Sequence, residues 1–400
     1  MPIETPERRA LRDSAQRFLA QRCDFARHHH RQQQPRLGLD RALWRQFADM
    51  GWLGVTVDEA AGGLGGSAHD ALAIIQAMGG HFVAEPFAQT LAAAQLLQAL
   101  GSTAQKTRWL SGVCNGSALV LPAHAEAGAR HELACVQARA QTVAGGYRID
   151  GHKCAVPFGD DADALLVSAR TAGAVDSADG ISLFIVERHA TGLRFERHAG
   201  IAGEPLADVL LDGVIVTHAA LLGLQGEALA ALESAHRGLL AAACAEAVGT
   251  LDAVLQATRD YARTRRQFGA PLSSFQVIAH RLVDMFTQVE MARSMAGLAA
   301  NVLGDCAPIQ QQRLRLAACK AQVSAACHFV GEQAVQIHGG IGMTDELALS
   351  HQVRRLLALE REGGDCFHQL GVLARAVSDG ESLYGESADA ATATRAAELA

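Results

Sequence analysis

Two short segments in the last third of the chain carry residue types that suit the binding of phosphate. The segment YARTRRQFG (261–269) ends an alanine-rich helical pattern with three arginines, and AVQIHGGIGMTDE (334–346) places three glycines between two helical patterns. A guanidinium binds phosphate oxygens in bidentate fashion, and glycines let backbone N–H groups approach an anion. Taken singly, each segment is also explained by helix-dipole compensation or a tight turn. The residues are Arg263, Arg265, Arg266, Gly339, Gly340 and Gly342.

A third segment, REGGDCF (361–367), interrupts a long apolar helical pattern with Gly363 and Gly364. Glycine within a helix costs roughly 1 kcal/mol relative to alanine. Two glycines in succession indicate that the chain turns here or that another group comes close to its backbone.

The composition limits the classes of protein to which the chain can belong. With 400 residues, 49% of them hydrophobic, it can bury a large core in two or three domains. The formal net charge of −7 gives no basic surface for nucleic acid, and no run of 18 uninterrupted apolar residues suggests a membrane span. The first residues lack the apolar core of a signal peptide, so we expect a cytoplasmic protein.

The sequence predicts no metal site. The nine cysteines are scattered, and no C-x-x-C pair occurs. His28, His29 and His30 are adjacent and point in different directions, and no carboxylate or cysteine stands near them at ligand spacing. We interpret the segment RHHHRQQQPR (27–36) as a polar loop.

The elements that must position these residues fall into three regions. Residues 1–116 have helical periodicity, with start signals at Thr5-Pro6-Glu7 and at Asp40. Residues 117–222 contain short β-branched runs separated by turn signals and predict a small antiparallel β domain. The turn signals are Gly145-Gly146, Asp150-Gly151, Asp179-Gly180 and Asp212-Gly213.

Long alanine-rich helical patterns return from residue 223 to residue 378 and predict a helical bundle that offers faces to other subunits. Residues 379–400 lose this periodicity and are interpreted as a flexible tail. The predicted fold is therefore mainly α, with a central β domain between an N-terminal helical domain and a C-terminal four-helix bundle.

In this helix–sheet–helix order, the segments resemble the acyl-CoA dehydrogenase family of flavoproteins over nearly the whole chain. The resemblance rests on LWRQFADMGWLGVTVDEAAGGLGG, GYRIDGHKCAVPFGDDADALLVSAR, YARTRRQFGAPLSSFQVIAHRLVDM and AVQIHGGIGMTDELALSHQVRRL. Within the family, CAEAVG (244–249) and GGIGMT (339–344) resemble the small subunit of pimeloyl-CoA dehydrogenase and similar short partners of two-gene dehydrogenases.

The resemblance implies a reaction and a cofactor. A carboxylate removes the α proton of an acyl-CoA thioester while the β hydrogen leaves as hydride to N5 of FAD. Donors must polarise the thioester carbonyl, and the base needs a raised pKa. By resemblance, two segments contact the pyrophosphate and adenine end of FAD across a dimer interface. They contain Arg265, Gln267, Phe268, Gln336, Gly339 and Gly340.

The positions that carry the chemistry in the family differ here. The position of the usual glutamate base falls on Gly363, and the alternative base position on the first long helix of the last domain falls on Leu239. A W-I-T-like segment lies against the flavin ring in the family. The matching residues are Ala155, Val156 and Pro157, and proline has no N–H to offer.

The segments that would contact a partner's FAD are present, whereas the base and the flavin-ring residues are missing. This difference predicts the small subunit of a heteromer, an α2β2 assembly in which a larger homologous subunit supplies the glutamate base and the flavin-ring pocket. One alternative is a self-sufficient enzyme with a relocated base. Glu362 is one residue from the expected position, although one helical step rotates a side chain by about 100°. Glu346 and Glu246 are further acidic candidates, and Glu246 needs a partner if it is buried. A flavin-free scaffold subunit is the other alternative.

No residue pattern in the sequence identifies the acyl group or the electron acceptor. The small-subunit resemblance suggests a dicarboxylyl or sterol side-chain thioester, and family analogy suggests an electron-transfer flavoprotein as acceptor.

Overall fold

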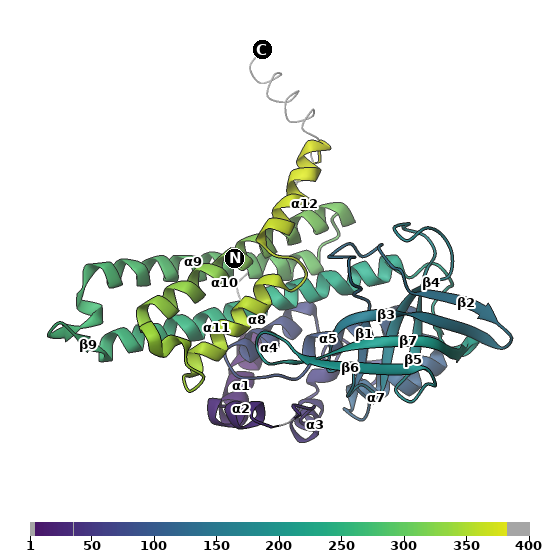
Figure 1. Cartoon of the computed structure of the whole chain (residues 1–400), viewed down its shortest axis with the longest axis horizontal. Helices are drawn as coiled ribbons and strands as arrows, with labels where there is room; N and C mark the ends of the chain where they lie inside the picture. Colours follow the sequence, from purple (N-terminus) through teal and green to yellow (C-terminus); the bar gives the residue numbers. More distant parts are fainter. Residues whose placement is uncertain (1–4, 35, 382–400) are drawn as a thin grey trace, which may run out of the picture. The chain divides into compact units, whose positions relative to one another are not determined.

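The computed structural model describes residues 5–34 and 36–381 and shows helices before and after a sheet along the chain (Figure 1). The described residues form two compact units. One comprises the described parts of 1–20 and 240–400 together with 75–81, and the other comprises the described parts of 21–74 and 82–239. The predicted domain boundaries at 116, 222 and 378 remain predictions.

The predicted starts of two N-terminal helices are confirmed. Helix α1 (Pro6–Arg22) begins at the proline, and α3 (Arg41–Asp49) follows Asp40, whose carboxylate accepts two N–H bonds of the first turn. Helix α3 ends before Gly51, which has a φ of +73°. The further helices and helical turns of this region are η1 (Trp52–Gly54), η2 (Glu59–Ala61), α4 (Ala68–Gly79), α5 (Phe87–Leu100), α6 (Thr103–Gln105), η3 (Lys106–Leu110) and α7 (Ser111–Cys114).

The prediction of a polar loop at His28–His30 is wrong. These residues lie in helix α2 (Phe25–Gln32). Asp24 caps the helix by accepting an N–H bond of 2.9 Å, and the Phe25 ring packs against Phe82 with centroids 5.4 Å apart. A capping aspartate and one apolar anchor thus outweigh the polar composition of the segment.

The central region forms one sheet with the strand order β6-β7-β3-β2-β4-β5-β8, and β1 pairs with β4. The β-branched runs GGYRIDGHKCAVPFG, DALLVSAR, DGISLFIVER and DVLLDGVIV predict four strands, which are confirmed as β3, β4, β5 and β7; β1, β2, β6 and β8 were not predicted. The strands are β1 (Val120–Ala123), β2 (Arg139–Val143), β3 (Gly146–Pro157), β4 (Ala164–Arg170), β5 (Ile181–Glu187), β6 (Leu193–Ala199), β7 (Pro205–Thr217) and β8 (Leu221–Leu222), with the turn η4 (His218–Ala220) before β8.

The sheet is mixed rather than purely antiparallel. Strands β1 and β4 run parallel, because the chain between them is long enough to cross over and contains the β2–β3 hairpin. Two of the predicted turns are confirmed, since Gly145 joins β2 to β3 and Gly180 precedes β5, both with positive φ.

The other two predicted turns lie within strands and meet at one bulge, where Asp212 and Gly213 of β7 oppose Asp150 of β3. Asp150-Gly151 lies inside β3 and Asp212-Gly213 inside β7, and the pairing register shifts between Ile149 and Gly151. The N–H of Gly213 donates to the Asp150 carboxylate at 2.8 Å, so the two Asp-Gly pairs are bonded to each other across the strands.

The predicted C-terminal bundle is confirmed, with α12 added to its four helices. Buried side chains of α8, α9, α10 and α11 form one core cluster, with Leu251, Val289, Val330 and Leu356 among them. The elements are α8 (Leu229–Thr264), β9 (Arg266–Gln267), β10 (Ala270–Pro271), η5 (Leu272–Ser274), α9 (Gln276–Leu303), α10 (Ile309–His338), η6 (Gly339–Met343), α11 (Ala348–Arg361) and α12 (Cys366–Ser378).

Helix α8 is long and apolar enough, by length and composition, to cross a membrane. Of its most apolar 18-residue window, 67% is buried within the protein, as in the core helix of a globular bundle. The predicted tail lies almost wholly outside the described residues, which end at 381.

Candidate functional site

The structure brings together the two segments predicted to bind phosphate. Tyr261, near the end of α8, stacks on His338 at the end of α10, with ring centroids 4.2 Å apart. The Tyr261 hydroxyl donates to the His338 carbonyl at 3.4 Å. Burial lowers the pKa of His338, which favours the neutral ring in this contact. Arg265 therefore follows the end of α8, Gly339 follows the end of α10, and these two helix ends are neighbours.

The arginine segment continues from α8 into a tight hairpin. Strands β9 and β10 pair antiparallel, and Phe268 and Gly269 form the turn between them with φ values of +52° and +82°. Phe268 is 92% exposed, although a phenylalanine at positive φ is uncommon. Arg265 and Gln267 are exposed as well. The predicted contact residues thus point away from their own core.

The glycine segment is open at its surface. Gly339 has a φ of +67°, and a Cβ added at Gly339 or Gly340 would meet nothing within 4 Å. Gln336 lies exposed on the last turn of α10. Exposed guanidinium, amide and glycine backbone groups near these two helix ends are of the types that bind phosphate oxygens.

Gly363, the predicted base position, lies in the turn between α11 and α12, which answers the question raised by the two glycines. Gly363 and Gly364 have φ values of +68° and +106°, where side chains are strained. The Gly363 carbonyl accepts a bond of 2.8 Å from the amide of buried Gln369. Asp365 then caps α12 by accepting the N–H of His368 at 2.8 Å.

A buried lysine, which was not predicted from the sequence, donates hydrogen bonds to backbone carbonyls at this turn. Lys320 of α10 is 1% exposed, and its ammonium donates to the carbonyls of Leu359, Glu360 and Gly364 at 3.0, 3.0 and 3.1 Å. It also bonds the Ser324 hydroxyl at 2.6 Å. Burial lowers the pKa of Lys320. The signal that could have found it is a lone lysine in an apolar helix.

The acidic alternatives near this turn are engaged elsewhere or exposed. Both oxygens of Glu246 accept bonds from Arg355, at 2.6 and 2.8 Å, which supplies the partner that a half-buried glutamate on α8 requires. Glu362 follows the last residue of α11, and its carboxylate lies 3.9 Å from the same guanidinium. Glu346 is exposed between η6 and α11, and Leu239 is an apolar residue of α8.

The segment predicted to face a flavin ring has few groups that could form hydrogen bonds to the ring. The N–H of Ala155 donates to the Asp208 carboxylate at 2.8 Å, and Pro157 has no N–H. The residues present here therefore do not fit the ring of FAD.

A buried polar cluster lies beneath the same strand. Lys153 is fully buried, and its ammonium donates to Glu126 at 2.6 Å and to Ser168 at 2.9 Å. His124 contacts the same hydroxyl at 2.8 Å, and burial together with the Lys153 charge lowers its pKa to about 3. Because every charge has a partner, we interpret the cluster as structural.

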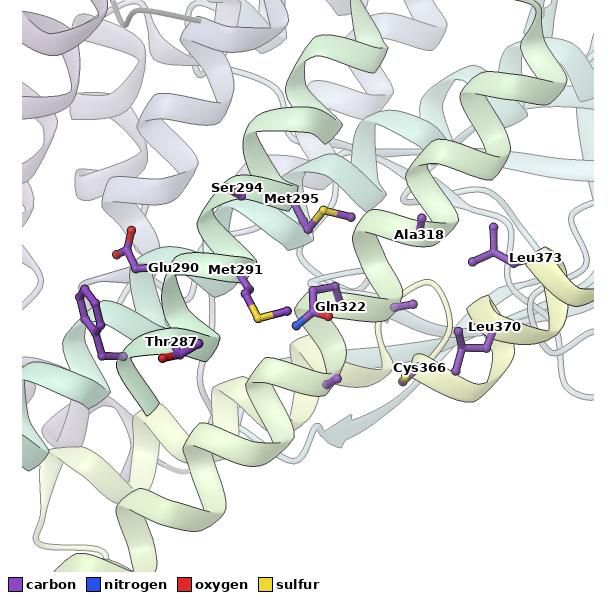
Figure 2. A pocket seen from close by; sticks show the side chains of 13 residues that line it. Thr287, Glu290, Met291, Ser294, Met295, Ala318, Gln322, Cys366, Leu370 and Leu373 are labelled. Carbon is purple, nitrogen blue, oxygen red and sulfur yellow. The ribbon is translucent and has the colours of Figure 1, made fainter. Parts of the chain in front are cut away.

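An open groove crosses the bundle between α9, α10 and α12 (Figure 2). Its volume is about 810 Å³, and its lining is largely apolar. The side chains that project into it include Met291, Met295, Leu370 and Leu373.

Comparison with known proteins defines the class to which this fold and these segments belong. Family models of the acyl-CoA dehydrogenase N-terminal, middle and C-terminal domains match residues 5–117, 123–214 and 236–378. The chain belongs to the acyl-CoA dehydrogenase family, whose members carry out FAD-dependent dehydrogenation.

Several relatives are similar over most of their length. The probable acyl-CoA dehydrogenase YngJ of Bacillus subtilis is 30% identical over 340 residues, covering 83% of this chain and 88% of that protein. The Tcur3481-Tcur3483 steroid ACAD has a TM-score of 0.83 at 26% identity, covering 94% of this chain and 98% of that one. The ChsE4-ChsE5 complex of Mycobacterium tuberculosis has the same TM-score at 24% identity, covering 94% and 99%, which shows the shared fold.

Proposed function

We propose that this chain is the small subunit of a heteromeric, FAD-dependent acyl-CoA dehydrogenase. A larger homologous subunit supplies the carboxylate base and the pocket for the flavin ring. This chain supplies Arg265, Gln267 and Phe268 from one segment, and Gln336, Gly339 and Gly340 from the other, to the pyrophosphate and adenine end of the partner's cofactor.

The observation that carries the proposal is the turn at Gly363. A glycine with no proton-accepting side chain stands at the base position, and Lys320 holds the carbonyls on either side of it. The hydrogen bonds from Lys320 thus fix the conformation of this turn within the bundle. The α proton of a bound thioester has no acceptor at this point of the chain, so the acceptor must come from elsewhere.

Exposed apolar side chains of the C-terminal helices support a subunit role. Met343 is 74% exposed, Phe367 83% and Phe286 54%, and the groove of Figure 2 adds a further apolar surface. Large apolar patches on a protein surface mark sites of association. The similar Tcur3481-Tcur3483 steroid ACAD is designated by two names, which is in keeping with a two-protein enzyme.

A self-sufficient enzyme with Glu362 as a relocated base is the second candidate. It is favoured by the position of Glu362 directly before the glycine turn, where the chain has left the helix. Its proximity to the Arg355 guanidinium, which already holds Glu246, argues against a role as proton acceptor.

The test is to purify the full chain alone and after co-expression with a larger homologue that carries a base-position glutamate. We expect visible flavin absorbance and acyl-CoA oxidation only from the co-purified complex. A yellow chain that turns over alone would support Glu362 instead, and a colourless, inactive complex would leave a flavin-free scaffold.

We extend the proposal to the substrate, the electron acceptor, the assembly and the location of the enzyme. Its substrate is a dicarboxylyl or sterol side-chain thioester, its electron acceptor is an electron-transfer flavoprotein, its assembly is α2β2 and its location is the cytoplasm. Assays of the complex with thioesters of these two classes test the first of these statements. Equal or better turnover of a simple fatty acyl-CoA would contradict it.

A further inference from the structure

We propose that the sheet carries a binding site for a borderline divalent metal ion of the Zn²⁺ type, formed by His152, Cys154 and Asp208, with His198 as the fourth donor. The sequence analysis predicted no metal site, because the donors come from three separate strands. The site does not depend on the proposed function of the chain.

The donor atoms already lie at distances close to those around a tetrahedral ion. His152 Nε2 is 3.2 Å from Asp208 Oδ2 and 4.0 Å from Cys154 Sγ. The Zn²⁺ bond lengths to nitrogen, oxygen and sulfur place such pairs roughly 3.3 and 3.6 Å apart in a tetrahedral site. The ligand atoms of all three residues lie within 4.8 Å of one another, so side-chain rotation alone can close them around an ion.

The strand register explains why the four residues meet on one face. Strands β6, β7 and β3 are neighbours in the sheet, as labelled in Figure 1. His152 stands opposite Leu210, and His198 stands opposite Leu206, the residues on either side of Asp208 along the same face of β7. Residues of alternate parity, such as Val209, are buried on the other face.

A bulge in β3 brings the thiol into the cluster. The register shifts between Lys153 and Val156, so that two residues, Cys154 and Ala155, oppose Asp208. Ala155 has a φ of +52°, which is strained for alanine, and its N–H donates to Asp208 Oδ1 at 2.8 Å. This bond fixes the carboxylate with its other oxygen toward His152, as hydrogen bonds to ligand side chains do in metal centres.

The fourth donor is within reach. His198 Nε2 lies 3.9 Å from Asp208 Oδ1, and its side chain is 43% exposed and can turn toward the other three. Two imidazoles, one thiolate and one carboxylate are the ligands that Zn²⁺ prefers, whereas Ca²⁺ and Mg²⁺ take oxygen donors almost alone. The donor set thus selects the class of ion.

A metal-free explanation of the same contacts exists and predicts different behaviour. A protonated His152 and the Asp208 carboxylate would form an ordinary surface ion pair, with Cys154 as a bystander. In that arrangement the thiol keeps its proton and no ion binds. A spectroscopic signal that depends on the thiolate therefore separates the two explanations.

The experiment uses the full, untagged chain after treatment with a chelator, titrated with Co²⁺ as the probe and then with Zn²⁺ as competitor. We expect one Co²⁺ per chain with a thiolate-to-cobalt charge-transfer band, lost when Zn²⁺ displaces it. Cys154→Ser abolishes the band, and His152→Ala weakens binding by about tenfold or more. Circular dichroism checks that each variant is folded.

The controls are Cys306→Ser and His189→Ala, which change an exposed thiol and an exposed imidazole away from the cluster and leave the band unchanged. Cobalt held by the histidines of α2 gives no thiolate band. Absence of the band in the wild-type chain, or its persistence in Cys154→Ser, would overturn the proposal. His152→Ala at an exposed position provides the same test if the serine variant fails to fold.

Discussion

Among single residues, Gly363 is the basis for assigning the proton acceptor to a partner. Its backbone conformation favours glycine, and glycine has no side chain that could accept a proton. Its φ of +68° is one that glycine adopts without strain, and Gly364 beside it is still more restricted. A Cβ at Gly364 would lie 2.4 Å from the His368 ring. The turn thus needs glycine for its shape, so the predicted base position carries no side chain that accepts a proton.

We expect Gly363→Ala to lower the free energy of unfolding by about 1–2 kcal/mol, because a Cβ disfavours the left-handed conformation. Gly363→Glu should cost about as much and should not create turnover in the isolated chain, since the residues at Ala155–Pro157 still do not suit a flavin ring. Thermal unfolding and acyl-CoA oxidation measure the two effects.

The control is Gly297→Ala, at an exposed helical position with free space around the added Cβ, which should stabilise the chain by up to about 1 kcal/mol. Turnover by the isolated Gly363→Glu chain would show that it holds a complete flavin site of its own.

Arg265 carries the second prediction at this scale. We expect Arg265→Ala to lower the flavin content of the purified complex, because an exposed guanidinium that contacts a phosphate is lost, while the unfolding midpoint stays within experimental error. The control is Arg259→Ala, which changes an exposed arginine earlier on α8 and should leave the flavin content unchanged. Equal flavin occupancy in wild type and Arg265→Ala would remove the assigned role.

At the scale of elements, buried charges fix how α8, α10 and α11 meet. Arg355 of α11 holds Glu246 of α8 through two bonds, and Lys320 of α10 holds the end of α11. These contacts join residues far apart in the sequence. The first pair joins two helices, and the second joins α10 to the turn at Gly363 and Gly364.

Glu246→Gln should lower the free energy of unfolding by about 1–3 kcal/mol, since a neutral amide replaces the carboxylate that accepts two bonds from the half-buried Arg355 guanidinium. The KM and kcat of the complex should stay close to those of wild type, because the glutamate is structural. Arg355→Met combined with Glu246→Gln should restore part of the loss in a double-mutant cycle. A collapse of kcat with unchanged stability would identify Glu246 as a base.

Lys320 gives a prediction about pH. Because burial lowers its pKa in the folded chain below the ordinary 10.5, the unfolded chain binds more protons between the folded pKa and 10.5. The contribution of Lys320 to stability therefore rises with pH through that window. The wild-type curve of unfolding free energy against pH should rise relative to that of Lys320→Met.

Two features make that comparison interpretable. The buried thiols of Cys319 and Cys327 have pKa values raised to about 12 and act in the opposite direction, but they are present in both proteins and largely cancel. Arg361→Met changes an exposed cation on α11 and should leave the curve parallel to wild type. Parallel curves for Lys320→Met would mean that Lys320 keeps its ordinary pKa.

The sequence predicted the order of the elements better than their details. Period and capping residues located α1 and α3, and β-branched runs located the main strands. The helix at His28–His30 was missed because its anchor, Phe82, is distant in sequence. The bulge at Asp212-Gly213, opposite Asp150, was predicted as a turn because bulges and turns share the same residue types.

The candidate site could be located but not completed from the sequence. Counting from the motifs placed Gly363, and the structure shows that it lies in a turn. The contacts of Lys320 and Arg355, and the cluster around Asp208, depend on packing between elements and strand register. A single sequence does not contain this information in local form.

At the scale of the whole molecule, the C-terminal bundle presents apolar surface that a lone chain would leave in water. Phe286→Glu and Met291→Glu, on the groove of Figure 2 and its rim, should each prevent co-purification of the larger subunit, because a charge buried in an apolar interface is costly. Sedimentation analysis gives the mass of the assembly. Leu224→Glu, at an exposed apolar position outside the bundle core, is the matched control.

An unchanged mass for both groove variants would place the interface elsewhere on the chain. It would leave the assignment of the base to a partner untouched, since that assignment rests on Gly363.

Whether the proton acceptor belongs to another polypeptide can be decided by measuring kcat in complexes altered one carboxylate at a time. Replacing the base-position glutamate of the larger subunit by glutamine should abolish acyl-CoA oxidation, whereas Glu362→Gln and Glu246→Gln in this chain should leave kcat close to that of wild type. Loss of kcat in the Glu362→Gln complex, with the partner's change tolerated, would contradict the account.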